Sequence, residues 1–165
     1  MLSGDLGPNN ERRRAVETSV IDEETGAYCN ADQIRSFIRA FEECTLPRSE
    51  WTHPAHLTVA MWYLMERSEI EATTCIRKGI LRYNGANGIK TTADSGYHET
   101  ITLFWTRLVA KYLSATDGGR SILELANGVI RAFGNKDIPF EYYSRDRLLS
   151  LEARMRWVEP DLKPI

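Results

Sequence analysis

Apolar residues recur at helical spacing along most of the chain. Between residues 31 and 43 they recur at i, i+3, i+4 and i+7, which predicts a helix with one buried face. That face consists of Ile34, Phe37, Ile38 and Phe41. Asn30 stands directly before this helix, where its side chain can cap the free amides of the first turn. The same periodicity predicts further helices over residues 52–67, 69–83, 97–113, 121–133 and 145–157.

The helices predicted for residues 52–67 and 69–83 have specific features. Thr52 is suited to cap the first of them, and Pro54 is tolerated in the first turn because its missing N–H has no partner there. One face of this helix carries His53, His56 and Tyr63, beside an apolar stripe. In the second helix we expect four apolar side chains to be buried: Ile70, Ile76, Ile80 and Leu81.

The pattern as a whole predicts an all-α protein, folded as a single helical bundle of five to six helices. A chain of 165 residues is long enough for one domain with a real core and too short for two. Residues 1–27 mix Gly, Pro, Asn and charge and show no helical period. We therefore expect a flexible or partly extended N-terminal segment, followed by a helical-bundle domain over residues 28–165.

Composition and charge exclude several classes of function. A hydrophobic fraction of 42% and a charged fraction of 27% are ordinary for a soluble globular protein. The net charge of -2 gives no basic surface for nucleic acid or for a membrane. The chain shows neither a secretory signal nor a run of about 20 apolar residues that could span a membrane. Its three cysteines are odd in number and lack C-x-x-C spacing, so we expect reduced thiols in a cytoplasmic protein.

Residues 84–96 form the longest turn-rich interval between the predicted helices. Such a loop in a compact domain is more often functional than idle. Its fragment Gly-Ile-Lys-Thr-Thr, residues 88–92, has a superficial likeness to a phosphate-binding loop. The adjacent Gly-Lys pair and the preceding strand are both missing, so the sequence does not predict a phosphate loop here.

All three histidines fall in two short segments at predicted helix starts. His53 and His56 are three residues apart, so their Cβ atoms lie about 5–6 Å apart on a helix and the imidazoles can converge on one ion. A third ligand has to come from a facing helix, and His98 is the only histidine left. We therefore predict that His53, His56 and His98 bind a divalent transition metal. Three imidazoles leave a coordination position open, as in catalytic sites, and suit Zn, Fe, Cu or Ni alike.

Residues near the histidines are candidates for further roles. Glu99 follows His98 and points about 100° away around the helix, so it is a candidate fourth ligand or a general base beside a metal-bound water. The candidate catalytic residues are Glu99, Tyr63 and Tyr143, since a tyrosine can donate a proton. The candidate substrate-binding residues are Tyr97, Thr102, Trp105 and Arg145, the arginine being suited to hold a carboxylate.

These residues support three functional hypotheses. The first is a metal-dependent enzyme acting on a small molecule, a hydrolase if the ion activates water and an oxygenase if it is iron and activates dioxygen. The second is a non-catalytic helical module that binds a small ligand or a protein partner. The third is a metal-free acid–base enzyme that uses His98 and Glu99. A purely structural role is the alternative for every residue, because a histidine can cap a helix and aromatic residues at helical spacing are usually core.

The two histidine motifs carry a resemblance to known proteins. The segments Trp51-Thr52-His53 with His56-Leu57 and Tyr97-His98-Glu99-Thr100, together with Phe41, Trp157-Val158 and Pro160-Asp161-Leu162, resemble a family of small uncharacterised bacterial proteins over about residues 36–162. That resemblance implies no activity. The chain is more loosely similar to helical-bundle proteins of the DinB/YfiT type, which implies a metal-dependent enzyme with a three-histidine site. The histidine spacing departs from theirs, so only the general idea transfers.

Overall fold

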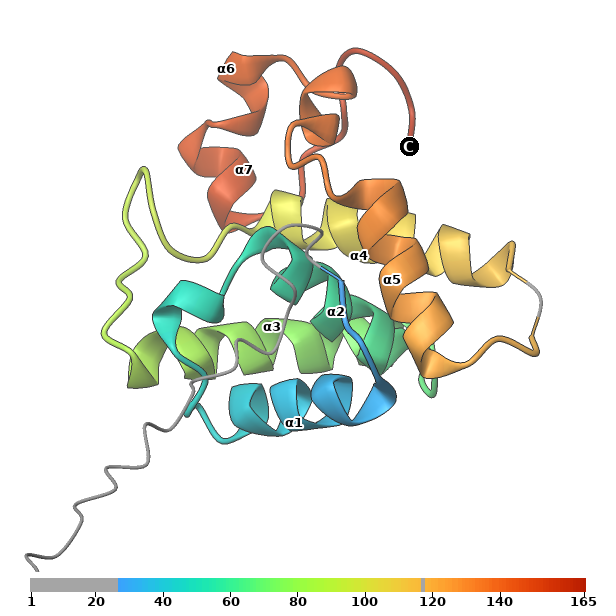
Figure 1. Ribbon diagram of the computed structural model, residues 1–165. Coiled ribbons are helices and arrows are strands. Elements are labelled where there is room, and N and C mark those ends of the chain that lie inside the picture. Colours follow the sequence, from blue (N-terminus) through green and yellow to red (C-terminus); the bar gives the residue numbers. More distant parts are fainter. Residues whose placement is uncertain (1–26, 117) are drawn as a thin grey trace, which may run out of the picture.

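The computed structural model describes residues 27–116 and 118–165, and in these residues it consists of helices joined by turns and loops, with no strand (Figure 1). The α-helices are α1 (Ala31–Glu42), α2 (His53–Leu64), α3 (Glu69–Ala86), α4 (Glu99–Ser114), α5 (Ile122–Phe133), α6 (Arg145–Leu148) and α7 (Leu151–Met155). Two 3₁₀ helices, η1 (Arg48–Glu50) and η2 (Ile138–Glu141), complete them. The all-α fold class is confirmed. Of the described helices, none is long and apolar enough to cross a membrane.

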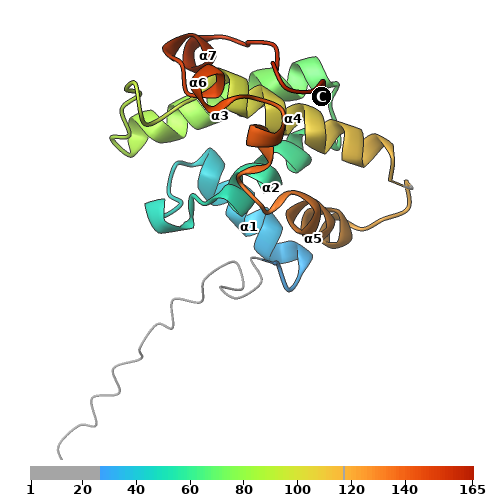
Figure 2. The ribbon, with the colours of Figure 1, turned by 90° about the horizontal axis from the view of Figure 1, so that it is seen from above.

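Helix α2 forms the centre of the bundle. Its residues are apolar around almost the whole circumference, which is typical of a helix that is buried on every side. It contacts α1, α3, α4 and α5, and Figures 1 and 2 show it in the middle of them. Its buried residues are Ala55, Leu57, Thr58, Val59, Ala60, Met61 and Tyr63. The residues at the start of α2 are therefore held against the other helices from the first turn.

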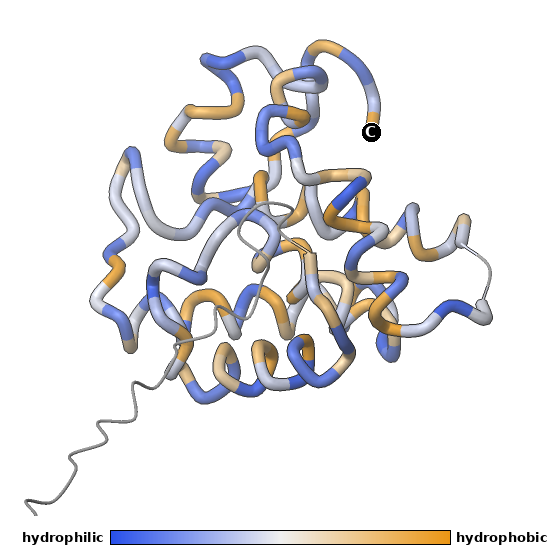
Figure 3. Tube along the Cα trace, in the orientation of Figure 1, coloured by the Kyte–Doolittle hydropathy of each residue, from blue (hydrophilic) through white to orange (hydrophobic). Residues whose placement is uncertain are grey.

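Helix α1 has the boundaries and the buried face that its sequence predicts. All four residues of the predicted stripe are buried. The Asn30 side chain accepts a hydrogen bond from the Gln33 amide, and the Gln33 side chain reaches back to the Asn30 amide, which closes a capping box. Figure 3 shows hydrophobic and hydrophilic positions alternating along this helix. The N-terminal residues 1–26, predicted to be flexible or partly extended, lie outside the described residues.

Three predicted helices differ clearly in extent from the observed ones, and one of them, predicted for residues 69–83, continues to Ala86 as α3. The helix predicted to reach residue 67 ends at Leu64, because Ser68 caps α3 and forms a capping box with Glu71. Thr52 is the N-cap of α2 by position, but its side chain makes no capping hydrogen bond, so that predicted role is wrong. The helix predicted for residues 145–157 is two short helices, since the Ser150 hydroxyl accepts from the Ala153 amide and starts α7 afresh.

Helix α3 buries a single face. Ile76 and Ile80 are buried as predicted, but 82% of Ile70 and 46% of Leu81 are exposed, so the prediction was wrong for these two. Leu81 follows Ile80 directly and points about 100° away around the helix. Ile70 stands six residues before Ile76, which places it about 120° from that residue's direction. Both side chains therefore leave the face that packs against the bundle.

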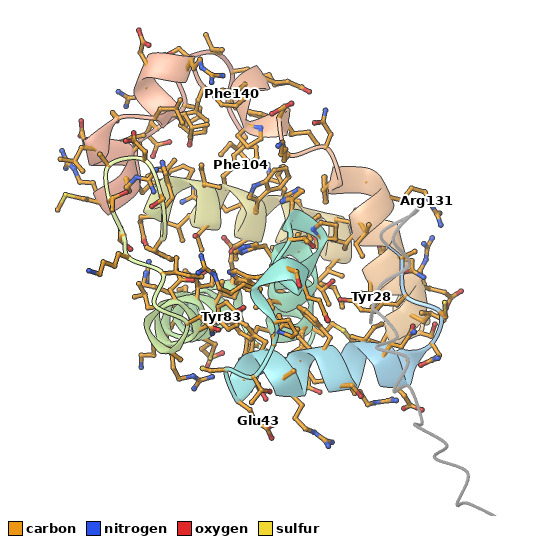
Figure 4. The ribbon with its side chains drawn as sticks, turned by 60° about the vertical axis from the view of Figure 1, so that its left-hand side comes forward. Tyr28, Glu43, Tyr83, Phe104, Arg131 and Phe140 are labelled. Carbon is orange, nitrogen blue, oxygen red and sulfur yellow. The ribbon has the colours of Figure 1, made fainter. Side chains whose placement is uncertain are left out.

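The C-terminal residues pack against α4, and this packing fixes the start of that helix. Phe104 of α4 is fully buried and lies between α4 and the C-terminal helices in Figure 4, with its ring centroid 6.1 Å from that of Tyr143. The Thr100 hydroxyl donates to the Arg156 carbonyl at 2.8 Å and accepts from the Val158 amide at 3.2 Å. Helix α7 and the segment after it are thereby joined to the first turn of α4.

The loop between α3 and α4 turns back on itself at Gly96. This residue has a φ of +81°, a backbone conformation that residues other than glycine rarely adopt. A Cβ at this position would lie 2.6 Å from the Lys90 carbonyl oxygen and 2.7 Å from the Thr91 Cα. The backbone at residue 96 can therefore approach the backbone at residues 90 and 91 this closely only because residue 96 has no side chain.

Replacing Gly96 with alanine is expected to destabilise the protein by about 1–3 kcal/mol, because the new Cβ meets backbone atoms and the positive φ becomes strained. Gly85→Ala is the matched control, since a Cβ there meets nothing within 4 Å and the site lies in α3. We expect it to stabilise the protein by about 0.5–1 kcal/mol. Urea denaturation of both variants measures the difference, and equal effects would contradict the assigned loop geometry.

Candidate functional site

A cavity of about 510 Å³ lies between α2, α3, α4, α7 and the loop that precedes α4. This volume is within the range of about 300–1,000 Å³ found for small-molecule sites. The apolar part of its lining is formed by Trp51, Ala60, Ile76, Ile80, Ile89, Tyr97, Ile101 and Trp105. The polar part is formed by Thr52, His53, His56, Asn84, Asp94, Ser95, His98, Thr102, Thr106 and Arg154. All three histidines of the chain therefore line one cavity.

Helix α4 forms one long wall of the cavity. The residues that it and its N-cap contribute, His98, Ile101, Thr102, Trp105 and Thr106, recur at i, i+3, i+4, i+7 and i+8 and so share one face. Trp105 stands seven residues after His98, which corresponds to about 10 Å along the helix axis. The cavity thus extends for roughly two helical turns.

His98 is the N-cap of α4 and uses both ring nitrogens within the protein. Its Nδ1 accepts a hydrogen bond from the Ile101 amide at 3.3 Å, so Nδ1 carries no proton. The proton of the neutral ring is then on Nε2, which donates to the Leu148 carbonyl at 3.0 Å. Burial, together with the positive charge of Arg154, lowers the pKa of His98 to about 4. This imidazole is neutral near pH 7 and has no free nitrogen.

His53 uses only one ring nitrogen in hydrogen bonds to the described residues. Its Nε2 lies 2.9 Å from the Phe133 carbonyl oxygen, to which it donates, so Nδ1 is left as an unprotonated acceptor. The ring packs against Trp105 with a centroid distance of 4.6 Å. Burial lowers the pKa of His53, and the nearby Lys136 lowers it further, although the bond to Phe133 opposes both. His53 is therefore a neutral hydrogen-bond acceptor on the cavity wall.

His56 has no hydrogen bond to any residue that the structure describes. Its ring lies against Trp51, with the two centroids 3.9 Å apart. Burial lowers the pKa of His56 to about 4, and the neighbouring His53 contributes in the same direction. A neutral imidazole has one donor and one acceptor nitrogen. Because His56 lines the cavity, a molecule bound there can supply the hydrogen-bond partners that the described residues do not.

Glu99 lies outside the cavity and pairs with α3. Both Nε and Nη2 of Arg77 donate to its carboxylate, the Nε bond being 3.1 Å long, and the Tyr97 hydroxyl donates to it at 2.6 Å. Burial raises the pKa of Glu99, but the hydrogen bonds from Arg77 and Tyr97 outweigh that effect and hold it below its usual value. The carboxylate is thus ionised and engaged in a link between α3 and α4, and Glu99 is not among the residues that line the cavity.

Three other candidate residues also lie away from the cavity. The Tyr63 hydroxyl donates to Glu42 at 2.9 Å, and the Tyr143 hydroxyl donates to the Val158 carbonyl at 3.0 Å. The Arg145 guanidinium lies over the Phe140 ring, 5.2 Å from its centroid. The structure therefore does not bring Tyr63, Tyr143 or Arg145 together with the histidines. It does bring Tyr97, Thr102 and Trp105 to the cavity wall.

Arg154 of α7 is the main cavity residue that sequence reasoning missed. It is 8% exposed, and its Nη1 donates to the Ser95 and Tyr97 carbonyl oxygens, each at 3.2 Å. Its Nε is buried and finds no acceptor among the described residues. Arg154 stands in a short helix far along the chain from both histidine motifs, and no motif distinguishes it from the other arginines.

The residues fit a metal ion less well than the sequence suggested. Within residues 27–116 and 118–165, no group of three or more His, Cys, Asp or Glu side chains is placed so that it could hold a metal ion. His98 would have to give up its bonds to Ile101 and Leu148 before it could ligate. The metal site formed by His53, His56 and His98 stays a prediction.

Comparisons with known proteins leave the family of this chain open. The likeness of the two histidine motifs to the uncharacterised bacterial family, and the looser one to DinB/YfiT-type proteins, stay predictions. No protein-family model matches the chain, and no curated protein or solved structure gives a significant match.

Proposed function

We propose that the protein binds a small organic molecule with a flat apolar body in the cavity between α2, α3, α4, α7 and the loop before α4. The observation that carries this proposal is His56, which lines a ligand-sized cavity and makes no hydrogen bond to any described residue. Buried polar groups in proteins are normally hydrogen-bonded. A ligand in the cavity would complete the hydrogen bonding of this ring.

The apolar walls suit a flat molecule. Trp51 and Trp105 each present an indole ring beside an imidazole, and Ile76, Ile80 and Ile101 supply aliphatic surface between them. Aromatic rings favour offset or edge-to-face contact with other rings, which adds to the gain from burying apolar surface. Small-molecule sites combine such walls with a few placed polar groups.

The polar groups favour binding over acid–base catalysis. An acid–base enzyme built on His98 and Glu99 needs a free nitrogen and a free carboxylate. His98 uses both nitrogens to join Ile101 to Leu148, and Glu99 is held by Arg77 and Tyr97. The lowered pKa of His56 makes it a weak base, while it remains a good neutral hydrogen-bond partner. Among the three hypotheses, the ligand-binding module has the best support.

A metal-dependent enzyme is the second candidate. Its support is that His53 and His56 each keep an unprotonated nitrogen at the cavity, and neutral imidazoles ligate Zn, Fe or Ni. Elemental analysis of protein purified without an affinity tag tests it. A stoichiometric transition metal that His56→Ala removes would favour a hydrolase or an oxygenase over the binding module.

A cytoplasmic location is part of the proposal. The three cysteines, Cys29, Cys44 and Cys75, are all free thiols. Free thiols persist where the environment is reducing, as it is in the cytoplasm.

Filling the cavity is expected to abolish binding. In Thr102→Phe the larger ring occupies the space along α4, whereas Thr102→Val keeps the shape and serves as the control. We expect a panel of indole, phenol, benzoate and benzamide to include a fragment that quenches tryptophan fluorescence saturably, and Thr102→Phe to weaken its binding at least tenfold. The proposal is wrong if no fragment binds the wild type, or if a folded Thr102→Phe variant binds as well as Thr102→Val.

A further inference from the structure

The cavity contains a buried cation without a carboxylate partner. Arg154 is 8% exposed, and no Asp or Glu of the described residues forms an ion pair with it. Its Nη1 donates to two carbonyl oxygens, which carry only partial negative charge, and its Nε has no acceptor in the part of the chain that the structure describes. A buried charge is costly unless it is paired, so this guanidinium is set up to receive an anion.

The charge lies at one end of the cavity. The carbonyl partners of Arg154 belong to Ser95 and Tyr97, just before His98, and the charge is close enough to lower the pKa of His98. Figure 1 shows α7 beside the loop and the first turn of α4, in agreement with these contacts. Arg154 is also the only Lys or Arg among the described residues that line the cavity, and the Asp94 carboxylate lines it too. A single lining cation matches a single negative charge better than a phosphate dianion.

The free imidazole nitrogens lie toward the other end. His53 packs on Trp105, about 10 Å along α4 from His98, and its Nδ1 can only accept a hydrogen bond. His56 offers a second acceptor nearby, since the two imidazoles are close enough for His53 to lower the pKa of His56. Between the ends, the wall of α4 is formed by Ile101 and Thr102.

From this arrangement, and resting on the binding function proposed above, we propose that the ligand is an aromatic monocarboxylate with a hydroxyl group at its far end. The carboxylate accepts from the Arg154 guanidinium that lines the cavity, the ring lies between Trp105 and the isoleucines, and the hydroxyl donates to Nδ1 of His53 or to His56. A hydrogen bond between two charged groups is roughly twice as strong as a neutral one, so the carboxylate contributes most of the specificity.

Isothermal titration of the full chain with three matched probes tests this. The probes are 3-(4-hydroxyphenyl)propanoate, its primary amide, which lacks the charge, and 3-phenylpropanoate, which lacks the hydroxyl. We expect the hydroxylated acid to bind about tenfold or more tightly than the amide and several-fold more tightly than 3-phenylpropanoate. Equal binding of acid and amide would overturn the inference and leave the binding function intact. If none of the three probes binds, the inference is wrong. The proposed binding function is then also wrong only if no fragment of the panel binds.

Variants test the role of Arg154 itself. In Arg154→Gln the affinity for the hydroxylated acid is expected to fall about tenfold while that for the amide stays the same. Arg145→Gln is the matched control, since Arg145 lies over Phe140 and does not line the cavity. Arg154→Lys keeps the charge and is expected to retain part of the preference for acid over amide. If Arg154→Gln does not fold, the acid–amide comparison on the wild type decides. A folded Arg154→Gln that keeps the preference contradicts the proposal.

Discussion

Replacement of His98 by alanine is expected to lower the free energy of unfolding by about 2–4 kcal/mol. The variant loses the N-cap acceptor for the Ile101 amide, and such a loss typically costs about 1 kcal/mol. It also leaves the buried Leu148 carbonyl without its donor, at a further cost of about 1–3 kcal/mol. Both losses fall at the junction of α4 and α6, where the C-terminal helices attach to the bundle.

His98→Asn and His56→Ala are the informative comparisons. Asparagine is a strong N-cap residue, so His98→Asn is expected to keep the bond to Ile101 and to lose only the one to Leu148. His56 makes no hydrogen bond to the described residues, so His56→Ala is expected to cost less than His98→Ala. Urea denaturation at pH 7.5 measures all three. An effect of His98→Ala no greater than that of His56→Ala would remove the structural role assigned to His98.

His98 also illustrates what the sequence could predict about the site. The sequence places a helix start near His98, and the structure has one there. Whether a residue is the N-cap or lies in the first turn depends on one or two residues, which periodicity does not resolve. That small difference decides whether His98 can bind a metal ion. As the N-cap, His98 uses Nδ1 to accept from a helix amide and Nε2 to donate to Leu148, so neither nitrogen is left for an ion.

The fold was more predictable than the site because helices depend on local pattern. The stripe of α1, with its capping asparagine, and the N-cap of α5 at Ser121 follow from neighbouring residues. Site contacts depend on residues that only the tertiary fold brings together. Arg77 of α3 binds the Glu99 carboxylate outside the cavity. Arg154 of α7 donates to the loop before α4, which is far away in the sequence. No local pattern marks either contact.

Acid is expected to destabilise the protein before its carboxylates begin to titrate. His98 is buried, with a pKa near 4 in the folded protein against an ordinary value of 6.5. Above pH 6.5 the ring is neutral in the folded and the unfolded state, so its titration does not change the free energy of unfolding. Below pH 6.5 the unfolded chain binds a proton at this histidine and the folded protein does not. The free energy of unfolding therefore falls as the pH falls, by about 1.4 kcal/mol per pH unit. Between pH 6.5 and 5 this amounts to roughly 2 kcal/mol for His98. His56, whose pKa is also lowered to about 4, and His53, whose pKa is lowered, act in the same direction.

The window between pH 6.5 and 5 separates the imidazoles from the carboxylates. Glu99 has a lowered pKa, and its stabilising effect is lost only as the pH falls below the ordinary value of 4.5. Urea denaturation at several pH values, on the wild type and on His98→Asn, therefore isolates the contribution of one ring. The variant is expected to lose stability less steeply than the wild type on acidification, by about 2 kcal/mol over the window, because it carries no imidazole at residue 98. Equal slopes would mean that His98 titrates normally in the folded state, which is incompatible with a neutral ring fixed between Ile101 and Leu148.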